Sequence, residues 1–193
     1  SDITVGLWKD QKWIHVWRIA SRPDLPELYF GVKIRDYFFE SENSVANVRT
    51  IVLSSVVPAM TEKIRNVSRT LFEKEPVVLG PKVYDLIPMG ILNPFEIGSD
   101  LVANAAAAYF KYKRHCIIVD FGTALTFTTV SGTGEILGVS IAPGLKTAIR
   151  SLSQNTAKLF DVPLEVPTSS MGKNTITAIQ SGIIFGYEGL VSN

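Results

Sequence analysis

The chain has 193 residues, a length that fits one domain or two small lobes. With 46% hydrophobic and 19% charged residues, the composition excludes a disordered protein. Its 19 basic and 18 acidic residues give a net charge of +1, which argues against a protein that coats nucleic acid, because such proteins need a clustered basic face. Cys116 is the only cysteine, so a disulfide within the chain is excluded.

No apolar run reaches the ~18 residues of a membrane-spanning helix. Residues Ser1–Thr4 carry neither a basic flank nor a signal-peptide core. We therefore expect a cytoplasmic protein with no membrane partner and no nucleic-acid partner.

Up to residue 114, strand and helix patterns alternate along the chain. In chain order they predict a hairpin (3–8 with 13–19), a helix (27–40), a strand (50–57), a helix (59–72), a short strand (76–80) and an Ala-rich helix (99–113). The run 50–57 is almost wholly apolar and β-branched, which is typical of a strand covered on both faces. The order strand, helix, strand predicts a parallel crossover.

After residue 114 the pattern begins again with a strand. The predicted elements are a buried strand (116–121), a tight turn (122–123), a hairpin (124–130 with 135–141), a helix (144–159) and a last apolar helix (174–192). We expect the boundary between lobes near Arg114–His115, which gives an N-terminal lobe (1–114) and a C-terminal lobe (115–193).

An aspartate stands where the buried strand ends. Asp120 is followed by Phe121, Gly122 and Thr123, and a glycine lets backbone approach a ligand closely. A carboxylate, a hydroxyl and backbone N–H groups at one opening can hold a cation and the phosphate that it bridges. The alternative is an aspartate that only hydrogen-bonds its own turn.

A second acid follows the segment Asn93–Ile97. Gly98 or Ser99 can cap the next helix, which places Asp100 in its first turn, where the helix dipole favours an ionised carboxylate. Such a group can accept the proton of a substrate hydroxyl, and phosphoryl transfer asks little more of its base. An ordinary acid at a helix N-terminus is the alternative. We expect Asp100 and Asp120 to converge on one cleft between the lobes.

A third segment, Gly172 to Thr175, precedes the last helix. Asn174 or Thr175 can cap that helix, and Lys173 can reach a phosphate or a carboxylate. The chain has no Walker-type phosphate loop.

Taken together, these segments resemble the type III pantothenate kinases, a family of the acetate/sugar-kinase and actin-like ATPase superfamily. The motifs occur in the family's order over nearly the whole chain: Ser54–Pro58, Asn93–Asp100, Val119–Ala124, Ile141–Leu145, Gly172–Thr175, Gln180–Ile183 and Gly186–Val191. The resemblance implies an α/β fold of two ribonuclease-H-like lobes, each a mixed sheet flanked by helices, and a homodimer.

The same resemblance implies ATP-dependent phosphorylation of pantothenate to 4′-phosphopantothenate, the first step of coenzyme A biosynthesis. ATP would bind with Mg²⁺, and a monovalent cation, K⁺ or NH₄⁺, would assist. The implied roles are Asp100 as general base, Asp120 as cation ligand, Gly122 and Thr123 at the nucleotide phosphates, Thr175 at the substrate, and Gly98 and Ser99 lining the substrate side.

The chain departs from the family pattern at its ends and in the substrate pocket. The family begins with an Asp-x-Gly-Asn-Thr/Ser nucleotide loop, of which Ser1 alone would remain, and continues past Val191, so we expect truncation at both ends. In the substrate pocket, Leu101 replaces the usual Arg, and Ile91 replaces an aromatic residue. Because Arg grips a carboxylate bidentately, the acid end of pantothenate lacks its obvious partner, and Lys173 is one substitute.

Two other functions remain open on these grounds. One is a non-catalytic regulatory relative that keeps the fold without the pocket. The other is a kinase that acts on a different small hydroxylated substrate.

Overall fold

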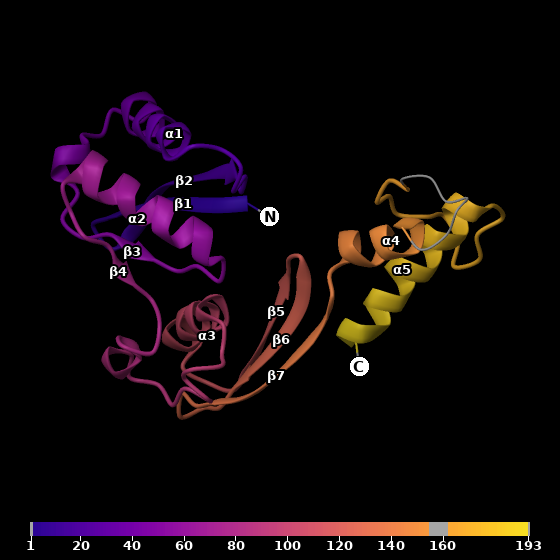
Figure 1. The fold of residues 1–193 in the computed structure, drawn as a ribbon. Coiled ribbons are helices and arrows are strands. Elements are labelled where there is room, and N and C mark those ends of the chain that lie inside the picture. Colours follow the sequence, from indigo (N-terminus) through magenta and orange to yellow (C-terminus); the bar gives the residue numbers. More distant parts are fainter. Residues whose placement is uncertain (1, 155–161, 193) are drawn as a thin grey trace. The chain divides into compact units, whose positions relative to one another are not determined.

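The computed structural model describes residues 2–154 and 162–192. Its elements in chain order are β1 (Asp2–Lys9), β2 (Lys12–Ala20), α1 (Glu27–Glu40), η1 (Val45–Asn47), β3 (Val52–Leu53), α2 (Pro58–Phe72), β4 (Val77–Val78), η2 (Tyr84–Leu86), α3 (Ser99–Tyr112), β5 (Cys116–Phe121), β6 (Ala124–Val130), β7 (Ile136–Pro143), α4 (Leu145–Gln154) and α5 (Thr175–Ser192) (Figure 1). The chain forms two compact units, Ser1–Ala106 and Ala107–Asn193, and each is described by itself.

The first unit opens with the predicted hairpin of β1 and β2. The strands pair antiparallel from Asp2↔Ala20 to Lys9↔Lys12. Asp10 and Gln11 form the two-residue turn with φ of 50° and 61°. Two successive positive φ values are the geometry of a hairpin turn whose twist matches its strands.

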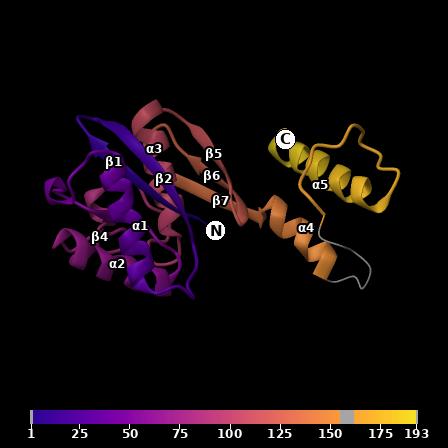
Figure 2. The ribbon, with the colours of Figure 1, turned by 90° about the horizontal axis from the view of Figure 1, so that it is seen from above.

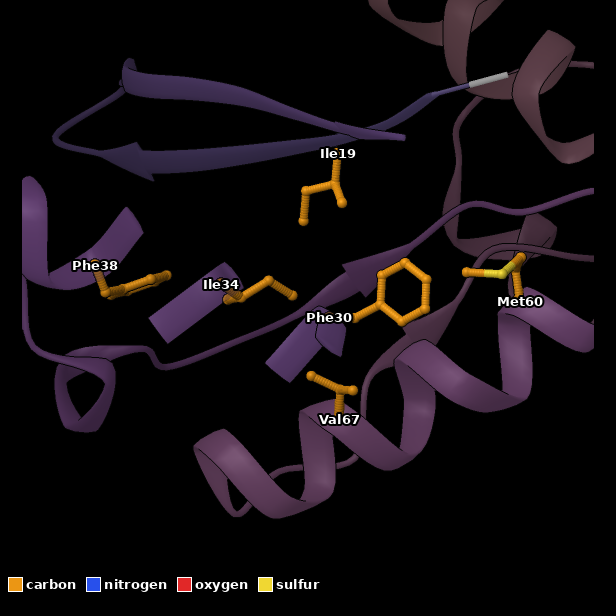
Figure 3. Packing of buried hydrophobic residues seen from close by; sticks show 6 residues of the cluster. All are labelled: Ile19, Phe30, Ile34, Phe38, Met60 and Val67. Atoms are coloured by element: carbon orange, nitrogen blue, oxygen red, sulfur yellow. The ribbon is translucent and has the colours of Figure 1, made fainter. Parts of the chain in front are cut away.

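The core of the first unit lies between this hairpin and the two long helices. Phe30, Ile34 and Phe38 recur every fourth residue of α1, so they share one helix face. Figure 3 shows them pointing toward side chains of β2 and α2. The buried cluster consists of Ile19, Phe30, Ile34, Phe38, Met60 and Val67. Burial of these side chains fixes α1 and α2 against the hairpin and gives the unit its stability.

The predicted crossover is confirmed, because β3 and β4 pair in parallel on either side of α2. The prediction that residues 50–57 form a strand covered on both faces is wrong. The ladder of β3 covers only Val52 and Leu53, and the Val52 side chain is 67% exposed. In the described residues β4 is the only hydrogen-bonded neighbour of β3, and beyond Leu53 the Ser55 hydroxyl bonds the backbone of Val57 instead of extending the strand.

The second unit contains an antiparallel sheet in the order β5-β6-β7. The predicted hairpin is confirmed, and its turn is held by the Ser131 hydroxyl, which accepts bonds from the N–H groups of Thr133 (3.2 Å) and Glu135 (2.9 Å). Gly134 takes a φ of +86° there. Helices α4 and α5 lie side by side in both views (Figure 2). Residues 155–159 of the predicted helix 144–159 lie outside the described residues.

The fold is α/β, as predicted. The expected mixed sheets do not form within residues 2–154 and 162–192. The sheets β1-β2 and β5-β6-β7 are wholly antiparallel, and the pair β3-β4 is wholly parallel. Among the described residues of the first unit, no strand hydrogen bonds join the hairpin to the parallel pair, so the two remain separate sheets. No helix in the described part of the chain combines the length and hydrophobicity that a membrane crossing requires.

Candidate active site

Asp100 lies in the first turn of α3, as the sequence predicts. The Gly98 carbonyl accepts the first helical hydrogen bond from the Val102 N–H at 3.2 Å, so Gly98 occupies the capping position. The Asp100 side chain is exposed, and its Oδ1 accepts a hydrogen bond from the Leu101 N–H at 2.9 Å. The free N–H groups of the helix terminus stabilise a negative charge at this point. Asp100 is therefore an accessible acid whose carboxylate is oriented by the start of α3.

The start of α3 is attached to the end of β3. The Ser99 hydroxyl lies 3.1 Å from the Ser54 hydroxyl and donates to the Ser55 carbonyl oxygen at 3.4 Å. A Cβ at Gly98 would meet Val56 Cγ1 at 3.6 Å, so this glycine also faces the segment after β3. Two motifs that are 45 residues apart in sequence thus form one local structure beside Asp100.

Tyr84 is a neighbour of Asp100 that the sequence patterns do not indicate. It begins η2 and is only 4% exposed. Burial raises the pKa of Tyr84 above its usual value, and the negative charge of Asp100 raises it further. The phenol therefore stays neutral near the carboxylate. Its only sequence signal is an aromatic residue among turn-forming residues.

The two positions that depart from the family pattern also lie in the first unit. Leu101 is buried, at 9% exposure, and Ile91 is half-buried in the loop before the Asn93–Pro94 turn. Leu101 and Ile91 are both apolar. Neither position therefore provides a positive charge for a substrate carboxylate near Asp100. Asn93 adopts a φ of 41°, which asparagine tolerates, and its carbonyl accepts the N–H groups of Glu96 and Ile97.

In the second unit, Asp120 occupies the next-to-last position of β5, opposite Thr126 of β6. The chain then turns tightly, with the Gly122 N–H donating to the Ala124 carbonyl oxygen at 2.9 Å. Asp120, Gly122 and Thr123 are all exposed. The predicted turn is confirmed, and its residues lie at the surface at the strand end.

The start of α4 packs directly on this turn. The Thr123 carbonyl oxygen accepts the Gly144 N–H at 2.9 Å and the Thr147 hydroxyl at 2.7 Å. A Cβ at position 144 would lie 2.1 Å from the Gly122 carbonyl oxygen, so only glycine fits. The Pro143–Gly144 pair is the one sequence signal of this packing.

The segment before α5 is a capped helix start. Asn174 Oδ1 accepts the Thr177 N–H at 2.9 Å, and the Thr177 hydroxyl accepts the N–H of Asn174 at 3.2 Å, a reciprocal capping arrangement. The predicted cap at Asn174 is confirmed. A Cβ at Gly172 would lie 2.1 Å from the Ala178 nitrogen, so the loop runs directly against the helix backbone.

Thr175 is exposed and faces an open hollow of about 630 Å³. The hollow is lined by Leu152, Gly172, Lys173, Asn174, Thr175, Ala178, Ile179, Gly182 and Ile183. Two buried polar side chains of α5 bind the loop that precedes this helix. Gln180 donates to the Pro163 carbonyl oxygen at 2.9 Å, and Ser181 donates to the Ser169 carbonyl oxygen at 2.7 Å.

The predicted site residues fall into two local groups. Those of the first unit gather around Asp100, and those of the second unit lie at the β5 turn and at the start of α5. The convergence of Asp100 and Asp120 on one cleft stays a prediction, and Ser1 lies outside the described residues. Over residues 2–154 and 162–192 no three His, Cys, Asp or Glu side chains gather as a metal-binding cluster.

Asp120 has a carboxylate, which supplies the oxygen ligands that hard cations prefer. Its carboxylate is exposed at the strand end, beside the oxygen-bearing residues Thr123 and Thr126. K⁺ and Mg²⁺ bind oxygen ligands, and NH₄⁺ donates hydrogen bonds to oxygen, whereas zinc prefers nitrogen and sulfur ligands.

The family profile and the similar sequences that match this chain carry the same description. The sequence profile described as type III pantothenate kinase matches residues 1–193. Two proteins named type III pantothenate kinase, from Citrifermentans bemidjiense and from Geobacter sp. strain M21, are each 37% identical over 191 residues, which is 99% of this chain and 75% of theirs.

A crystal structure from Campylobacter jejuni, described as a Baf family transcriptional activator, shares the fold with a TM-score of 0.51 at 19% identity. The match covers 92% of this chain and 70% of that one. With the family profile matching from end to end, the chain belongs to the type III pantothenate kinase family.

Proposed function

We propose that this protein transfers the γ-phosphoryl group of ATP to the hydroxyl of pantothenate and forms 4′-phosphopantothenate, the first step of coenzyme A biosynthesis. Membership of the family over the whole chain supports this reaction. The observation that carries it is the exposed Asp100 carboxylate in the first turn of α3, oriented by the Leu101 N–H.

Asp100 is the proposed general base. It accepts the proton of the pantothenate hydroxyl as that oxygen forms a bond to the γ-phosphorus. The bond between the γ-phosphorus and the bridging oxygen breaks, and ADP leaves with the electron pair. Because the proton transfer needs only a correctly placed acceptor, the local structure that orients Asp100 matters as much as its basicity.

The turn after β5 is the proposed phosphate side of the site. Gly122 and Thr123 would contact the phosphates of ATP, and Asp120 would hold the monovalent cation, K⁺ or NH₄⁺. Mg²⁺ would accompany the nucleotide and neutralise charge on its phosphates. The close packing of Gly144 keeps this turn in one conformation, which reduces the entropy lost on binding.

The start of α5 is the proposed substrate side. Thr175 would contact pantothenate, and Lys173, exposed beside it, offers a positive charge for the carboxylate that Leu101 cannot bind. For the assembly we propose two ribonuclease-H-like lobes, 1–114 and 115–193, in an actin-like ATPase arrangement, and a cytoplasmic homodimer.

Replacement of the base tests the function. Asp100→Asn keeps the size of the side chain and removes its basicity, so kcat in a coupled ATP/pantothenate assay should fall by roughly 10²–10⁴ while ATP affinity is retained. Asp36→Asn, which changes an exposed acid of α1, is the matched control and should leave turnover unchanged. Unchanged turnover in Asp100→Asn would remove Asp100 from this role.

A kinase of a neutral hydroxylated substrate is the second candidate, because Leu101 is buried and apolar where a carboxylate-binding Arg is expected. A substrate panel distinguishes the two. Thermal denaturation distinguishes a kinase of pantothenate from a regulatory relative. A ligand at 100 times its Kd stabilises the protein by about 2.7 kcal/mol, so pantothenate with ATP should protect the kinase.

A further inference from the structure

Thr126 of β6 carries a buried hydroxyl that no protein atom satisfies. The residue as a whole is half-buried, but its Oγ1 is covered by the surrounding structure and has no hydrogen-bond partner within the described residues. Such an atom loses its contact with water without a replacement, which costs free energy, so buried hydroxyls in folded proteins nearly always have a partner. The hydroxyl of Thr126 is therefore a donor that a neighbouring acceptor would satisfy.

The residue directly opposite Thr126 on β5 is Asp120. In an antiparallel pair, the side chains of opposite residues lie on the same face of the sheet, with Cβ atoms about 4.5–5.5 Å apart. A hydroxyl and a carboxylate at this separation reach each other by rotation about their side-chain bonds. On the other side of Thr126, β7 places Ile141, whose side chain has no acceptor. Within this row across the sheet, the carboxylate of Asp120 is thus the side-chain acceptor that Thr126 can use.

We propose that Thr126 is a positioning residue for the proposed cation site: its hydroxyl donates a hydrogen bond to the Asp120 carboxylate and fixes the direction of the oxygen that faces the cation. The proposal rests on Asp120 holding K⁺ or NH₄⁺ in the proposed function. The bond forms when the carboxylate turns over β6, and the same turn gives the buried hydroxyl its missing partner. A carboxylate has about four acceptor sites, so Asp120 can accept this hydroxyl in addition to its other contacts and still bind a cation.

The alternative is a threonine that serves only as a β-branched residue of the strand. The two roles predict different effects of removing the hydroxyl. Thr126→Val keeps the shape and the branching of the side chain and removes a polar atom that has no partner, so in Na⁺ the urea midpoint should stay the same or rise. For a purely structural threonine the effect ends there. A positioning residue also changes how strongly the protein binds K⁺, because hydrogen bonds to a ligating carboxylate orient it.

Thermal denaturation in KCl and in NaCl at equal ionic strength, with ADP and Mg²⁺ in every sample, measures cation binding without catalysis. The unfolding temperature of the wild type should rise with K⁺ concentration, since a ligand that binds only the folded state stabilises it. In Thr126→Val the K⁺ concentration needed for a given rise should increase about tenfold, the lower end of what loss of such a hydrogen bond costs in metal affinity. Initial rates should show the same displacement along the K⁺ axis, with kcat at saturating K⁺ within about twofold of wild type.

Two further variants separate the hydroxyl from the strand. Thr126→Ser retains the hydroxyl and should restore the wild-type response to K⁺. Thr129→Val is the matched control, because Thr129 lies three positions further along β6, opposite Ile117, and so on the other face of the sheet. Its response to K⁺ should equal that of the wild type.

An unchanged response to K⁺ in Thr126→Val, together with a lost response in Asp120→Asn, would overturn the positioning role and leave the cation site at Asp120 intact. A response as weak in Thr126→Ser as in Thr126→Val would also overturn it, because the hydroxyl would then not be the cause. Failure of the proposed cation site has a different signature: the wild type would unfold at the same temperature in K⁺ and in Na⁺. That result would remove the cation from Asp120 and the role of Thr126 with it.

Discussion

The hydroxyl of Tyr187 donates a hydrogen bond to the carbonyl oxygen of Pro143, the last residue of β7. This bond joins positions 44 residues apart and attaches α5 to the point where Gly144 packs on the Gly122–Thr123 turn. In the second unit, the proposed phosphate segment and the helix that begins at Thr175 therefore belong to one connected structure.

Tyr187→Phe should lower the stability of the second unit modestly. The variant keeps the ring and removes one hydrogen bond, and because Pro143 is exposed, water replaces the lost donor. We expect a loss of about 0.5–1 kcal/mol in the free energy of unfolding, measured by urea denaturation. Tyr112→Phe, at an exposed ring on α3, is the control. Equal midpoints for Tyr187→Phe and wild type would mean that the bond contributes nothing.

Gly144→Ala should disrupt the turn after β5. The new Cβ would lie 2.1 Å from the Gly122 carbonyl oxygen, and backbone cannot yield as a flexible side chain does. We expect overpacking to cost about 1–3 kcal/mol and ATP affinity to fall, measured by calorimetry. Gly138→Ala on β7 is the control, because a Cβ there meets open space. Wild-type ATP affinity in Gly144→Ala would separate this turn from nucleotide binding.

Tyr84→Phe should change how stability depends on alkaline pH. The folded protein holds the pKa of Tyr84 above its usual value, first through burial and then through the charge of Asp100. The unfolded tyrosine loses its proton near pH 10, before the folded one does. This contribution to stability is therefore fully present below about pH 10 and is lost as the pH rises through the folded pKa.

Urea midpoints measured from about pH 8 to pH 11 should fall more steeply for wild type than for Tyr84→Phe. In Asp100→Asn the pKa of Tyr84 should move back toward its usual value, which ultraviolet absorbance of the phenolate reports. Parallel curves for wild type and Tyr84→Phe would contradict the raised pKa.

Potassium should activate the enzyme through Asp120. K⁺ or NH₄⁺ should raise the initial rate over that in Na⁺ at equal ionic strength, and Asp120→Asn should weaken that activation severalfold. Glu165→Gln, at an exposed acid of the same unit, should respond to K⁺ as wild type does. Equal rates of the wild type in sodium and potassium would argue against a cation ligand at position 120.

Elements set by local patterns were predictable from the sequence. The β6–β7 hairpin follows from alternation around a glycine-containing turn, and the start of α5 follows from Asn174 as a capping residue. Asp100 falls in the first helical turn because capping residues precede it. These features depend on neighbours within a few residues, which a single sequence displays.

Features set by contacts between distant segments were not predictable in the same way. The exposure of Val52 depends on which strands lie beside β3, and hydrophobicity alone does not determine that. The burial of Tyr84 near Asp100 and the contact of Gly144 with Gly122 depend on loop paths. Leu101 is buried in α3, and no local pattern of the sequence shows whether a residue there contacts a ligand.

The close approach of Gly172 to the backbone of Ala178 affects how members of this family are recognised from their sequences. A single methyl group at position 172 would collide with the main chain of α5 whatever the protein binds. A related protein without kinase activity would still require glycine at this position in order to fold. Glycine at this position in a related sequence therefore indicates that the fold is kept, and it does not by itself indicate kinase activity.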